Sequence, residues 1–456
     1  MKLAVIGGGS SQWMKSLMRD IYLLESAEGG EIRLVDPRRE AVEAVAEMLR
    51  AFNRMRDKAY EITVTENRRE ALDGADFVMT TFSPGGMEAF YHDLEIPIKY
   101  GIRIPVSMTV GPPGVSAALR TIPVAYEIVE DMEACCPGAW LLNVTNPMSA
   151  VTRSMNLAAK TVKVLGLCHE FHAFSGHMDR IFGLGQPDDV DILSYLYYWL
   201  GDQGFDYTIA GVNHFIWITN ATLNGEDVIP RIRQFAIENW DTKSDHTDYD
   251  ARANYNAAKL ALCRTFGYLP IVGDRHLVEF WPSLCNPRNG YATKYDVIKT
   301  TVDSRIHRAE QATTEVHRIA RGEQDIDWTP SGEEMTAIID GILTGKQTRC
   351  ILNLPNTGQI ANIPGDRIVE TLANVAGEGA TPEDAGELPG PIGTLCQLHS
   401  DIHEMTVSAA LSGNRDVAVQ TMALDPLSAG ADFSEIGAMT DELLSANREW
   451  LPRFFA

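Results

Sequence analysis

A short apolar run near the middle of the chain ends in side chains that can bind metals and transfer protons. The segment Val164–Leu167 is followed at once by CHEFH at positions 168–172. A thiolate beside imidazole and carboxylate groups suits a divalent transition metal. In open α/β sheets, ligands bind at the carboxyl ends of strands, which is where these residues are expected. The alternative is structural: a buried cysteine can act as a small apolar residue, with Glu170 and His172 solvated at a helix start.

Two more clusters follow in the second half of the chain. The strand-like segment Asp206–Val212 ends in Asn213-His214, an amide beside an imidazole, for which a satisfied core histidine is the alternative. The segment Gly267–Pro282 carries four ionisable side chains between apolar residues and turns, which is unusual for a solvated surface. These four are Asp274, Arg275, His276 and Glu279.

The start of the chain has the pattern of a dinucleotide site. An apolar run at 2–6 leads into Gly7-Gly8-Gly9-Ser10, a helical pattern, a second apolar run at 32–35 and then Asp36. The glycines let backbone N–H groups approach a pyrophosphate, and the acid accepts from a ribose hydroxyl. Any tight strand-to-helix turn is the alternative, and Gln12 stands where a third glycine is usual. Asp36 favours NAD over NADP, although Arg38 and Arg39 keep NADP open.

Other polar positions at strand ends complete the predicted cofactor and substrate site. The loop that begins at Ser83 follows the fourth strand and can cover the nicotinamide half of the cofactor. Asn146 precedes a proline, which holds it outside the helical region and can direct its amide toward a substrate. The predicted cofactor contacts are Gly7, Gly9, Ser10, Asp36, Ser83 and Asn143.

Alternating apolar runs and helical patterns predict an α/β fold with a doubly wound parallel Rossmann-like sheet and a C-terminal α+β domain. We expect an NAD-binding domain at 1–195 and a substrate, metal and oligomerisation domain at 196–456. The six predicted strands are 2–6, 32–36, 62–65, 77–81, 140–144 and 162–167, with helices at 39–55, 116–132 and 249–266. A polar loop is expected at 351–360, a surface linker at 379–391, and helices after it.

Composition limits the class of protein. Of 456 residues, 62 are Asp or Glu and 39 are Lys or Arg, a net charge of −23, and 45% are hydrophobic. Such an acidic protein attracts neither nucleic acid nor an anionic membrane. The seven cysteines are irregularly spaced and form no CxxC pair. Because we see no signal peptide and no membrane-spanning run, we expect a cytoplasmic protein.

Taken together, these motifs resemble glycoside hydrolase family 4, the NAD- and metal-dependent glycosidases with a lactate/malate dehydrogenase-like fold. The resemblance covers nearly the whole chain. Its motifs are GGGS at 7–10, GGMEA at 85–89, RTIPV at 120–124, TNP at 145–147, CHE at 168–170, GVNH at 211–214, NxPNxGxI at 353–360 and DPL at 425–427.

The resemblance implies a role for several residues. Cys168 and His214 would bind a divalent metal, usually manganese. Asn146 and Asn213 would orient the sugar. Asp274 falls where α-acting members carry the base for the C2 proton. His169 follows the metal-binding cysteine, where some members place an acid for the leaving oxygen.

The resemblance also implies the reaction, which differs from hydrolysis by two carboxylates. NAD takes hydride from C3, the metal polarises the resulting ketone, and a base removes the acidified C2 proton. The glycosidic oxygen leaves, water adds, and the hydride returns to C3. The net reaction is hydrolysis of a carbohydrate substrate, in a homodimer or homotetramer.

The CHE motif and GDRH at 273–276 resemble the branch that acts on α-linked galacturonides or glucuronides. Arg275 or His276 could bind the sugar carboxylate. The segment Ile104–Thr109 departs from the GQET pattern of many members, and lacks its acidic residue. The alternatives are an α-galactosidase or α-glucosidase of the same family, a metal-independent malate- or lactate-like dehydrogenase, and a non-catalytic NAD-binding regulator.

Overall fold

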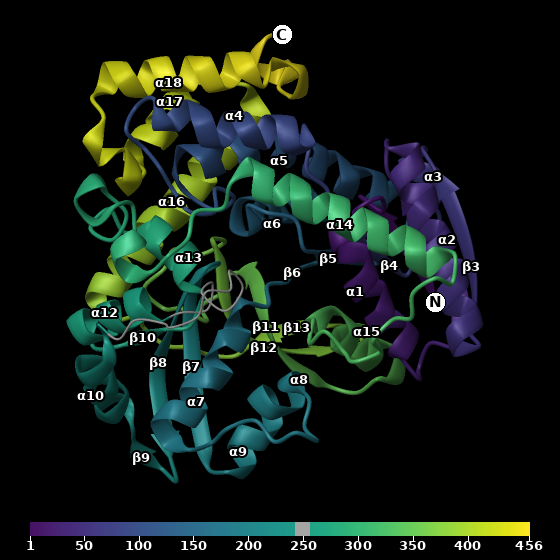
Figure 1. The fold of residues 1–456 in the computed structure, drawn as a ribbon, viewed down its shortest axis with the longest axis horizontal. Helices are drawn as coiled ribbons and strands as arrows, with labels where there is room; N and C mark the ends of the chain where they lie inside the picture. The colour runs from purple at the N-terminus through teal and green to yellow at the C-terminus, as the bar shows by residue number, and fades with distance from the viewer. Residues whose placement is uncertain (242–255) are drawn as a thin grey trace.

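The structure of the protein, a computed structural model, describes residues 1–241 and 256–456. Strands and helices alternate through the first part of the chain (Figure 1). The strands are β1 (Lys2–Ile6), β2 (Gly29–Val35), β3 (Ala59–Thr65), β4 (Phe77–Thr80), β5 (Trp140–Asn143) and β6 (Lys163–Gly166). The helices are α1 (Ser11–Leu23), α2 (Arg39–Arg56), α3 (Arg68–Leu72), α4 (Gly86–Ile98), α5 (Gly111–Cys135) and α6 (Met148–Ala158). All six predicted strands are confirmed.

These six strands are parallel and lie in the order β6-β5-β4-β1-β2-β3. This is the doubly wound order of dinucleotide-binding domains. The strand order reverses between β1 and β4, so the connections that follow these two strands diverge and open a crevice at the carboxyl edge of the sheet. The predicted fold class is therefore confirmed.

The second part of the chain extends the same sheet with antiparallel strands. They are β7 (Phe205–Val212), β8 (Phe215–Leu223), β9 (Glu226–Asp227), β10 (Leu269–Pro270), β11 (Thr348–Pro355), β12 (Ile368–Ala376) and β13 (Gly379–Pro382). Within the described residues the sheet runs β10-β8-β7-β12-β11 and joins β6 through β11, at Asn353 opposite Gly166. One sheet therefore crosses the predicted boundary at 195, and the two-domain division stays a prediction.

Two loop predictions in this part are wrong at their N-terminal ends: residues 351–355 and 379–382 are strand, whereas 356–360 and 383–389 form neither helix nor strand. Residues 348–355 form strand β11, which pairs with eight residues of β12. Its polar side chains and prolines suggested a loop, but pairing in the sheet satisfies its backbone hydrogen-bonding groups. The expected linker at 379–391 begins as β13, which pairs with β12. The predicted helix at 249–266 is α12, described from Ala257 to Phe266; its residues 249–255 lie outside the described residues.

Helices cover the sheet and close the molecule at its C-terminal end, as predicted. They are α7 (Ser175–Phe182), α8 (Ile192–Ser194), α9 (Leu200–Asp202), α10 (Ile229–Asn239), α12 (Ala257–Phe266), α13 (Asp274–Leu277), α14 (Val302–Ala320), α15 (Glu334–Thr344), α16 (Gly390–Ser412), α17 (Arg415–Leu424) and α18 (Phe433–Ala446). Helix α16 packs on α5 and α6, while α14 lies across α1 and α2 (Figure 1).

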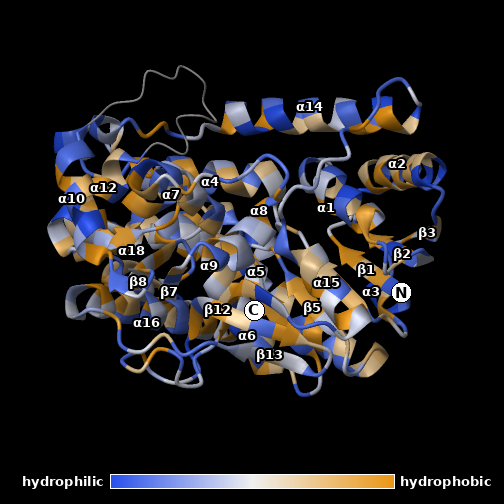
Figure 2. Ribbon diagram, turned by 90° about the horizontal axis from the view of Figure 1, so that it is seen from below, coloured by the Kyte–Doolittle hydropathy of each residue, from blue (hydrophilic) through white to orange (hydrophobic). Residues whose placement is uncertain are grey.

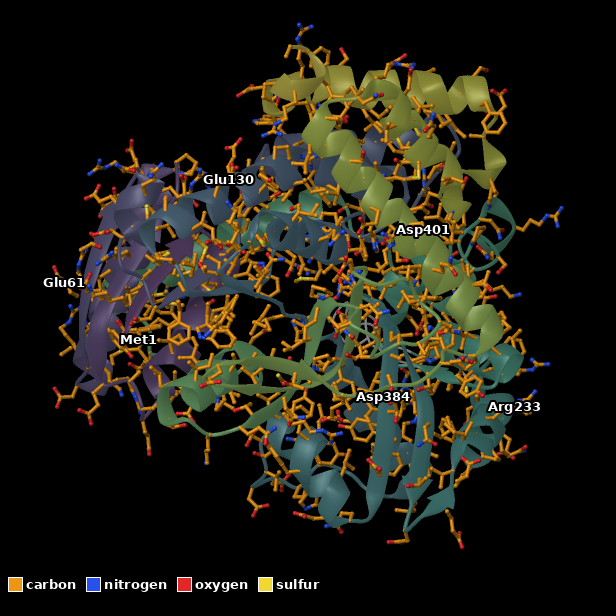
Figure 3. The ribbon with its side chains drawn as sticks, turned by 180° about the vertical axis from the view of Figure 1, so that it is seen from behind. Met1, Glu61, Glu130, Arg233, Asp384 and Asp401 are labelled. Carbon is orange, nitrogen blue, oxygen red and sulfur yellow. The ribbon has the colours of Figure 1, made fainter. Side chains whose placement is uncertain are left out.

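The core lies on both faces of the sheet. Alternate residues of β1 point to opposite faces: Leu3 and Val5 join one buried cluster, and Ala4 and Ile6 join the other. Figure 2 shows hydrophobic residues along β1 and β5. In Figure 3 the charged side chain of Glu61 lies at the periphery. In the part of the chain that the structure describes, no helix has the length and apolar character needed to cross a bilayer.

Candidate active site

Backbone hydrogen bonds hold the glycine-rich turn between β1 and α1 against β2. The amides of Gly7 and Gly8 donate to the carbonyl oxygen of Val35 at 2.8 and 3.0 Å. Gly7 has a φ of 91°, and a Cβ atom there would lie 2.1 Å from the carbonyl oxygen of Thr81, so the position requires glycine. The tight turn brings backbone N–H groups and the start of α1 to the crevice, which suits a pyrophosphate.

Asp36 faces this turn from the end of β2. Its carboxylate is 4% exposed and accepts from the amide of Gly9 at 3.0 Å. The Arg38 guanidinium donates to both carboxylate oxygens at 3.1 Å. Ser10 precedes the first residue of α1. Gly7, Gly9, Ser10 and Asp36 are thus brought together, in an arrangement that fits the adenosine and phosphate groups of NAD.

The loop after β4 is fixed by a buried ion pair. Arg120 on α5 forms two hydrogen bonds with the carboxylate of Asp93 on α4, and its Nε donates to the carbonyl oxygen of Pro84 at 2.9 Å. Ser83 in this loop is exposed and its side chain is free to meet a ligand. Arg120, quoted above only as part of a motif, therefore positions the backbone of the predicted nicotinamide loop.

Asn143 at the end of β5 is completely buried, and its amide is used inside the protein. Its Oδ1 accepts from the Thr80 hydroxyl and the Thr145 amide at 2.9 Å, and its Nδ2 donates to the Thr152 hydroxyl at 3.0 Å. These bonds fix the turn that carries Asn146, whose Oδ1 accepts from the backbone of the following helix. Direct contact between Asn143 and a cofactor stays a prediction.

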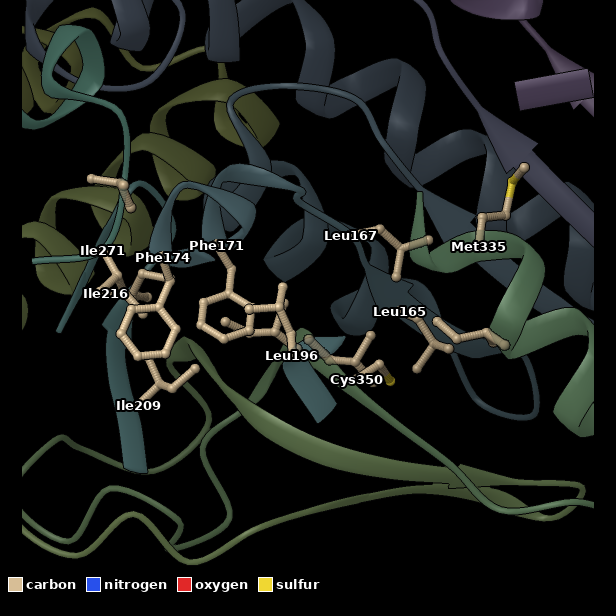
Figure 4. Close-up of a cluster of buried hydrophobic side chains, with 14 of the residues drawn as sticks. Leu165, Leu167, Phe171, Phe174, Leu196, Ile209, Ile216, Ile271, Met335 and Cys350 are labelled. Carbon is tan, nitrogen blue, oxygen red and sulfur yellow. The ribbon is translucent and has the colours of Figure 1, made fainter. Parts of the chain in front are cut away.

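The predicted metal-binding turn rests on a hydrophobic base. After β6, residues Glu170–Phe174 form one 3₁₀ turn, with Phe171 and Phe174 buried among apolar side chains such as Leu167 (Figure 4). Burial of these two aromatic side chains anchors the turn that carries the polar residues. Cys168, His169, Glu170 and His172 are each partly exposed.

His214 approaches from the hairpin between β7 and β8. Its backbone has a φ of 61°, and its Nδ1 lies 2.8 Å from the hydroxyl of Thr109. Its ring stacks on that of His276 with 3.9 Å between centroids. Burial holds the pKa of His214 well below its usual range, so the imidazole is neutral. With Nδ1 held by Thr109, Nε2 is the nitrogen left for a metal.

Asn213 connects the turn that carries Cys168 with the hairpin that carries His214. The Asn213 amide group forms a hydrogen bond with the Cys168 thiol, and its Nδ2 donates to Oε2 of Glu370 at 3.2 Å. Burial raises the pKa of the Cys168 thiol, and the nearby carboxylates of Glu370 and Glu170 raise it further. Metal binding must therefore displace the thiol proton. Burial also raises the pKa of Glu370 to about 7.

The donor set fits a divalent ion that keeps open positions. Within residues 1–241 and 256–456, no group of three or more His, Cys, Asp or Glu side chains is arranged to hold a metal. Cys168 and His214 can supply a sulfur and a nitrogen, and the buried Oδ1 of Asn213 has no hydrogen-bond partner among the residues that the structure describes. An ion held by these residues would have positions left for oxygen atoms of a substrate.

Two carboxylates, Glu170 and Asp274, also border the site. Glu170 accepts from the amide of Gly273 at 2.7 Å and lies 3.9 Å from Nε2 of His276. Burial opposes ionisation of Glu170, but three neighbouring imidazoles and the Gly273 amide lower its pKa to about 2. Asp274 is buried and accepts from the amides of Ala258 and Lys259 at 2.7 and 3.2 Å. Burial raises the pKa of Asp274 to about 7.

Arg275 and His276, which were predicted to bind the sugar carboxylate, are constrained by burial and by a contact within the protein. Burial lowers the pKa of His276 to about 4, so this imidazole offers a hydrogen bond without a charge at neutral pH. Arg275 donates to the hydroxyl of Thr300. Both residues border the site, and their contact with a substrate stays a prediction.

His169 is paired with a residue that the sequence did not single out. Its Nδ1 lies 3.0 Å from Oε1 of Glu333, which precedes α15. Burial lowers the pKa of His169, but the hydrogen bond and charge of Glu333 raise it to about 9. The ring of Trp13 on α1 lies 6.1 Å from that of His169. This contact places the predicted metal-binding turn next to the first turn of α1.

Sequence reasoning missed Thr109, Lys259, Glu333 and Glu370, and quoted Glu279 without a role. Two of them could have been recognised in the sequence as charged residues within apolar segments: Lys259 in the helical run AAKLALC and Glu370 in the strand IVETLANVA. Glu279 accepts from the backbone amides of Val106 and Ser107 at 2.5 and 3.1 Å. A carboxylate therefore reaches the segment in which the sequence has no acidic residue.

Comparison with known proteins identifies the family of this chain. The model described as "Family 4 glycosyl hydrolase" matches residues 2–184, and "Family 4 glycosyl hydrolase C-terminal domain" matches residues 209–428. An alpha-galacturonidase of Lachnoclostridium phytofermentans is 31% identical over 99% of this chain and 97% of its own length. An alpha-galactosidase of Bacillus subtilis is 29% identical over 99% of each chain.

Solved structures share the fold. The lplD structure from Bacillus subtilis superposes with a TM-score of 0.85 at 28% identity, over 97% of this chain and 99% of that one. A 6-phospho-alpha-glucosidase from gut microorganisms, solved with NAD and Mn2+, has a TM-score of 0.79 at 19% identity over 99% and 98% of the chains. These matches favour a glycosidase over the dehydrogenase and the regulator that the sequence left open. The chain belongs to family 4 of the glycosyl hydrolases.

Proposed function

We propose that this protein hydrolyses α-linked glycosides of uronic acids, galacturonides or glucuronides, with NAD and a divalent metal such as manganese. The observation that carries the proposal is the contact of Cys168 with Asn213, the residue before His214, on a turn whose His169 faces Trp13 of α1. A thiol and a neutral imidazole can bind a divalent transition-metal ion and leave positions open for substrate oxygens. The alpha-galacturonidase relative and the solved relative with NAD and Mn2+ support this choice.

The chemistry that NAD and the metal supply when bound is reversible uptake of hydride from C3 and polarisation of the C3 oxygen, which together acidify the C2 proton. The protein must then hold the sugar and move protons. Asn146 and Asn213 carry amides that can orient sugar hydroxyls at the edge of the site. The Oδ1 atom of Asn213 is well suited because it is buried and accepts no hydrogen bond within the described part of the chain.

Asp274 is proposed to take the C2 proton. A base with a pKa of about 7 is matched to neutral pH, where proton uptake and release are both accessible. Its two hydrogen bonds from the start of α12 leave further lone pairs on the carboxylate. His169, kept protonated beside Glu333, is proposed to give a proton to the leaving glycosidic oxygen.

A substrate panel tests this function. Purified protein with NAD and manganese is given 4-nitrophenyl α-glycosides of galacturonic acid, glucuronic acid, galactose and glucose, together with 6-phosphate forms. We expect fastest release from an α-uronide, loss of activity with chelator, and no accumulation of NADH. Full activity in chelator refutes the metal role, and NADH accumulation refutes a net hydrolysis.

The variant Cys168→Ser tests the metal ligand. We expect it to lose manganese binding and activity while its far-UV circular dichroism is unchanged. The matched control is Cys135→Ser, because Cys135 is also a half-buried free cysteine but lies at the end of α5. Equal loss in both variants contradicts a specific role for Cys168.

An α-galactosidase or α-glucosidase is the second candidate. The alpha-galactosidase relative is nearly as similar as the alpha-galacturonidase relative, at 29% against 31% identity. Faster release from the galactoside or glucoside than from either uronide would establish this alternative.

A further inference from the structure

Lys259 is a buried cation that the proposed reaction does not use. It is the third residue of α12, its side chain is 0% exposed, and its Nζ has no hydrogen-bond partner among the described residues. Burying an ammonium group costs several kcal/mol unless a partner compensates it. A lysine in this state points to a ligand that supplies the missing hydrogen bonds.

The surroundings of Lys259 belong to the active site. Helices α12 and α13 lie side by side (Figure 1), and Asp274 on α13 accepts from the backbone amide of Lys259 at 3.2 Å. Burial lowers the pKa of Lys259, whereas the charges of Asp274 and Glu170 raise it. Glu170 is bonded to Gly273 on the same turn. The ammonium group therefore lies near the proposed base and the metal-side turn, with its own donors unused.

The other cationic candidates have partners. Arg275 donates to Thr300, and His169 is paired with Glu333. His276 stacks on His214 and carries no charge at neutral pH. Lys259 thus differs from these residues in having a buried charge and free donors together.

We propose that Lys259 binds the carboxylate of the substrate's uronic acid unit and thereby selects uronides over neutral sugars. This inference rests on the proposed function. An ammonium group forms short charge-assisted hydrogen bonds with a carboxylate, and the two charges compensate each other away from water. A neutral sugar carries a CH2OH group at this position, which cannot form charge-assisted hydrogen bonds with the ammonium group. A site built for a polar group rejects an analogue that lacks it far more strongly than an apolar pocket does.

The test compares Lys259→Met with the wild-type holoenzyme, supplied with NAD and manganese. Methionine keeps the length and packing of the side chain and removes the charge. We expect kcat/KM for the 4-nitrophenyl α-uronide to fall by about 100-fold or more, and that for the matching neutral glycoside to change by less than about 5-fold. The control is Lys346→Met, because Lys346 is exposed in the connection between α15 and β11. An equal fall on both substrates overturns the proposal.

A change in the substrate checks the same contact from the other side. The uronide methyl ester lacks the negative charge, so wild-type enzyme should lose about the factor that Lys259→Met loses on the acid, whereas Lys259→Met should treat acid and ester alike. Lys259→Gln serves if the methionine variant does not fold, with the same expectation. A variant that still prefers acid to ester overturns the proposal.

The wild-type panel separates the two claims. If wild-type enzyme prefers the neutral glycoside, the proposed function is wrong and the role of Lys259 falls with it. If wild-type enzyme prefers the uronide and Lys259→Met keeps that preference, only the role of Lys259 is wrong.

Discussion

The hydrogen bond between Thr109 and His214 makes a quantitative prediction about metal affinity. A metal on Nε2 of His214 requires the ring proton on Nδ1, which then donates to the Thr109 hydroxyl at 2.8 Å. Valine has nearly the shape of threonine but cannot accept this bond. Thr109→Val therefore leaves a buried N–H without a partner, at a cost of about 1–3 kcal/mol. Loss of such a partner typically weakens metal binding by about 10- to 100-fold.

The assay is a manganese titration without substrate, followed by electron paramagnetic resonance of free Mn2+. We expect the Kd of Thr109→Val to rise by about 10- to 100-fold. NAD affinity, followed by tryptophan fluorescence, should not change. The control is Thr121→Val: Thr121 is also buried on the adjoining helix, but its hydroxyl bonds to its own helix at the carbonyl of Ala117. Wild-type manganese affinity in a folded Thr109→Val would refute the reasoning.

Three further predictions concern stability and are read from urea unfolding. Arg120→Met leaves Asp93 buried without its partner, so we expect a loss of about 3–5 kcal/mol and looser binding of NAD. Burial raises the pKa of Glu279 from 4.5 to about 7, so the contribution of Glu279 to the free energy of unfolding falls as pH rises from about 4 to 7. Across that window, Glu279→Gln should gain up to about 3 kcal/mol of stability relative to wild type. The exposed control Glu130→Gln should show no such gain. Phe171→Ala removes the base of the metal-side turn and should cost about 3–5 kcal/mol.

Local patterns in the sequence were sufficient for the parallel part of the fold. Each strand from β1 to β6 is a short apolar run that ends in a turn, and in the helices between them the apolar residues recur with the helical period. The glycine turn and Asp36 could be paired because they lie on consecutive elements of one βαβ unit. The same argument placed Cys168 at the carboxyl end of a strand.

Long-range contacts could not be predicted in this way. Thr109 and His214 are 105 residues apart, and Asn213 and Glu370 are 157 residues apart. Nothing in the sequence near either partner specifies the other, because the contact depends on the order in which distant strands join the sheet. The strand at 348–355 was missed for the same reason: its partner strand, rather than its composition, makes it extended.

The charges in this site also explain why metal and substrate should reinforce each other. Burial raises the pKa values of Asp274 and Glu370 to about 7, and Glu170, with a pKa lowered to about 2, is negatively charged. A uronate entering this site adds another anion, which the carboxylates oppose. A divalent ion bound at Cys168 and an ammonium group of Lys259 at the substrate, as proposed above, would be the positive charges that offset this repulsion. Since coupling between two ligands is reciprocal, an ion that favours the uronate must be held more tightly once the uronate is bound.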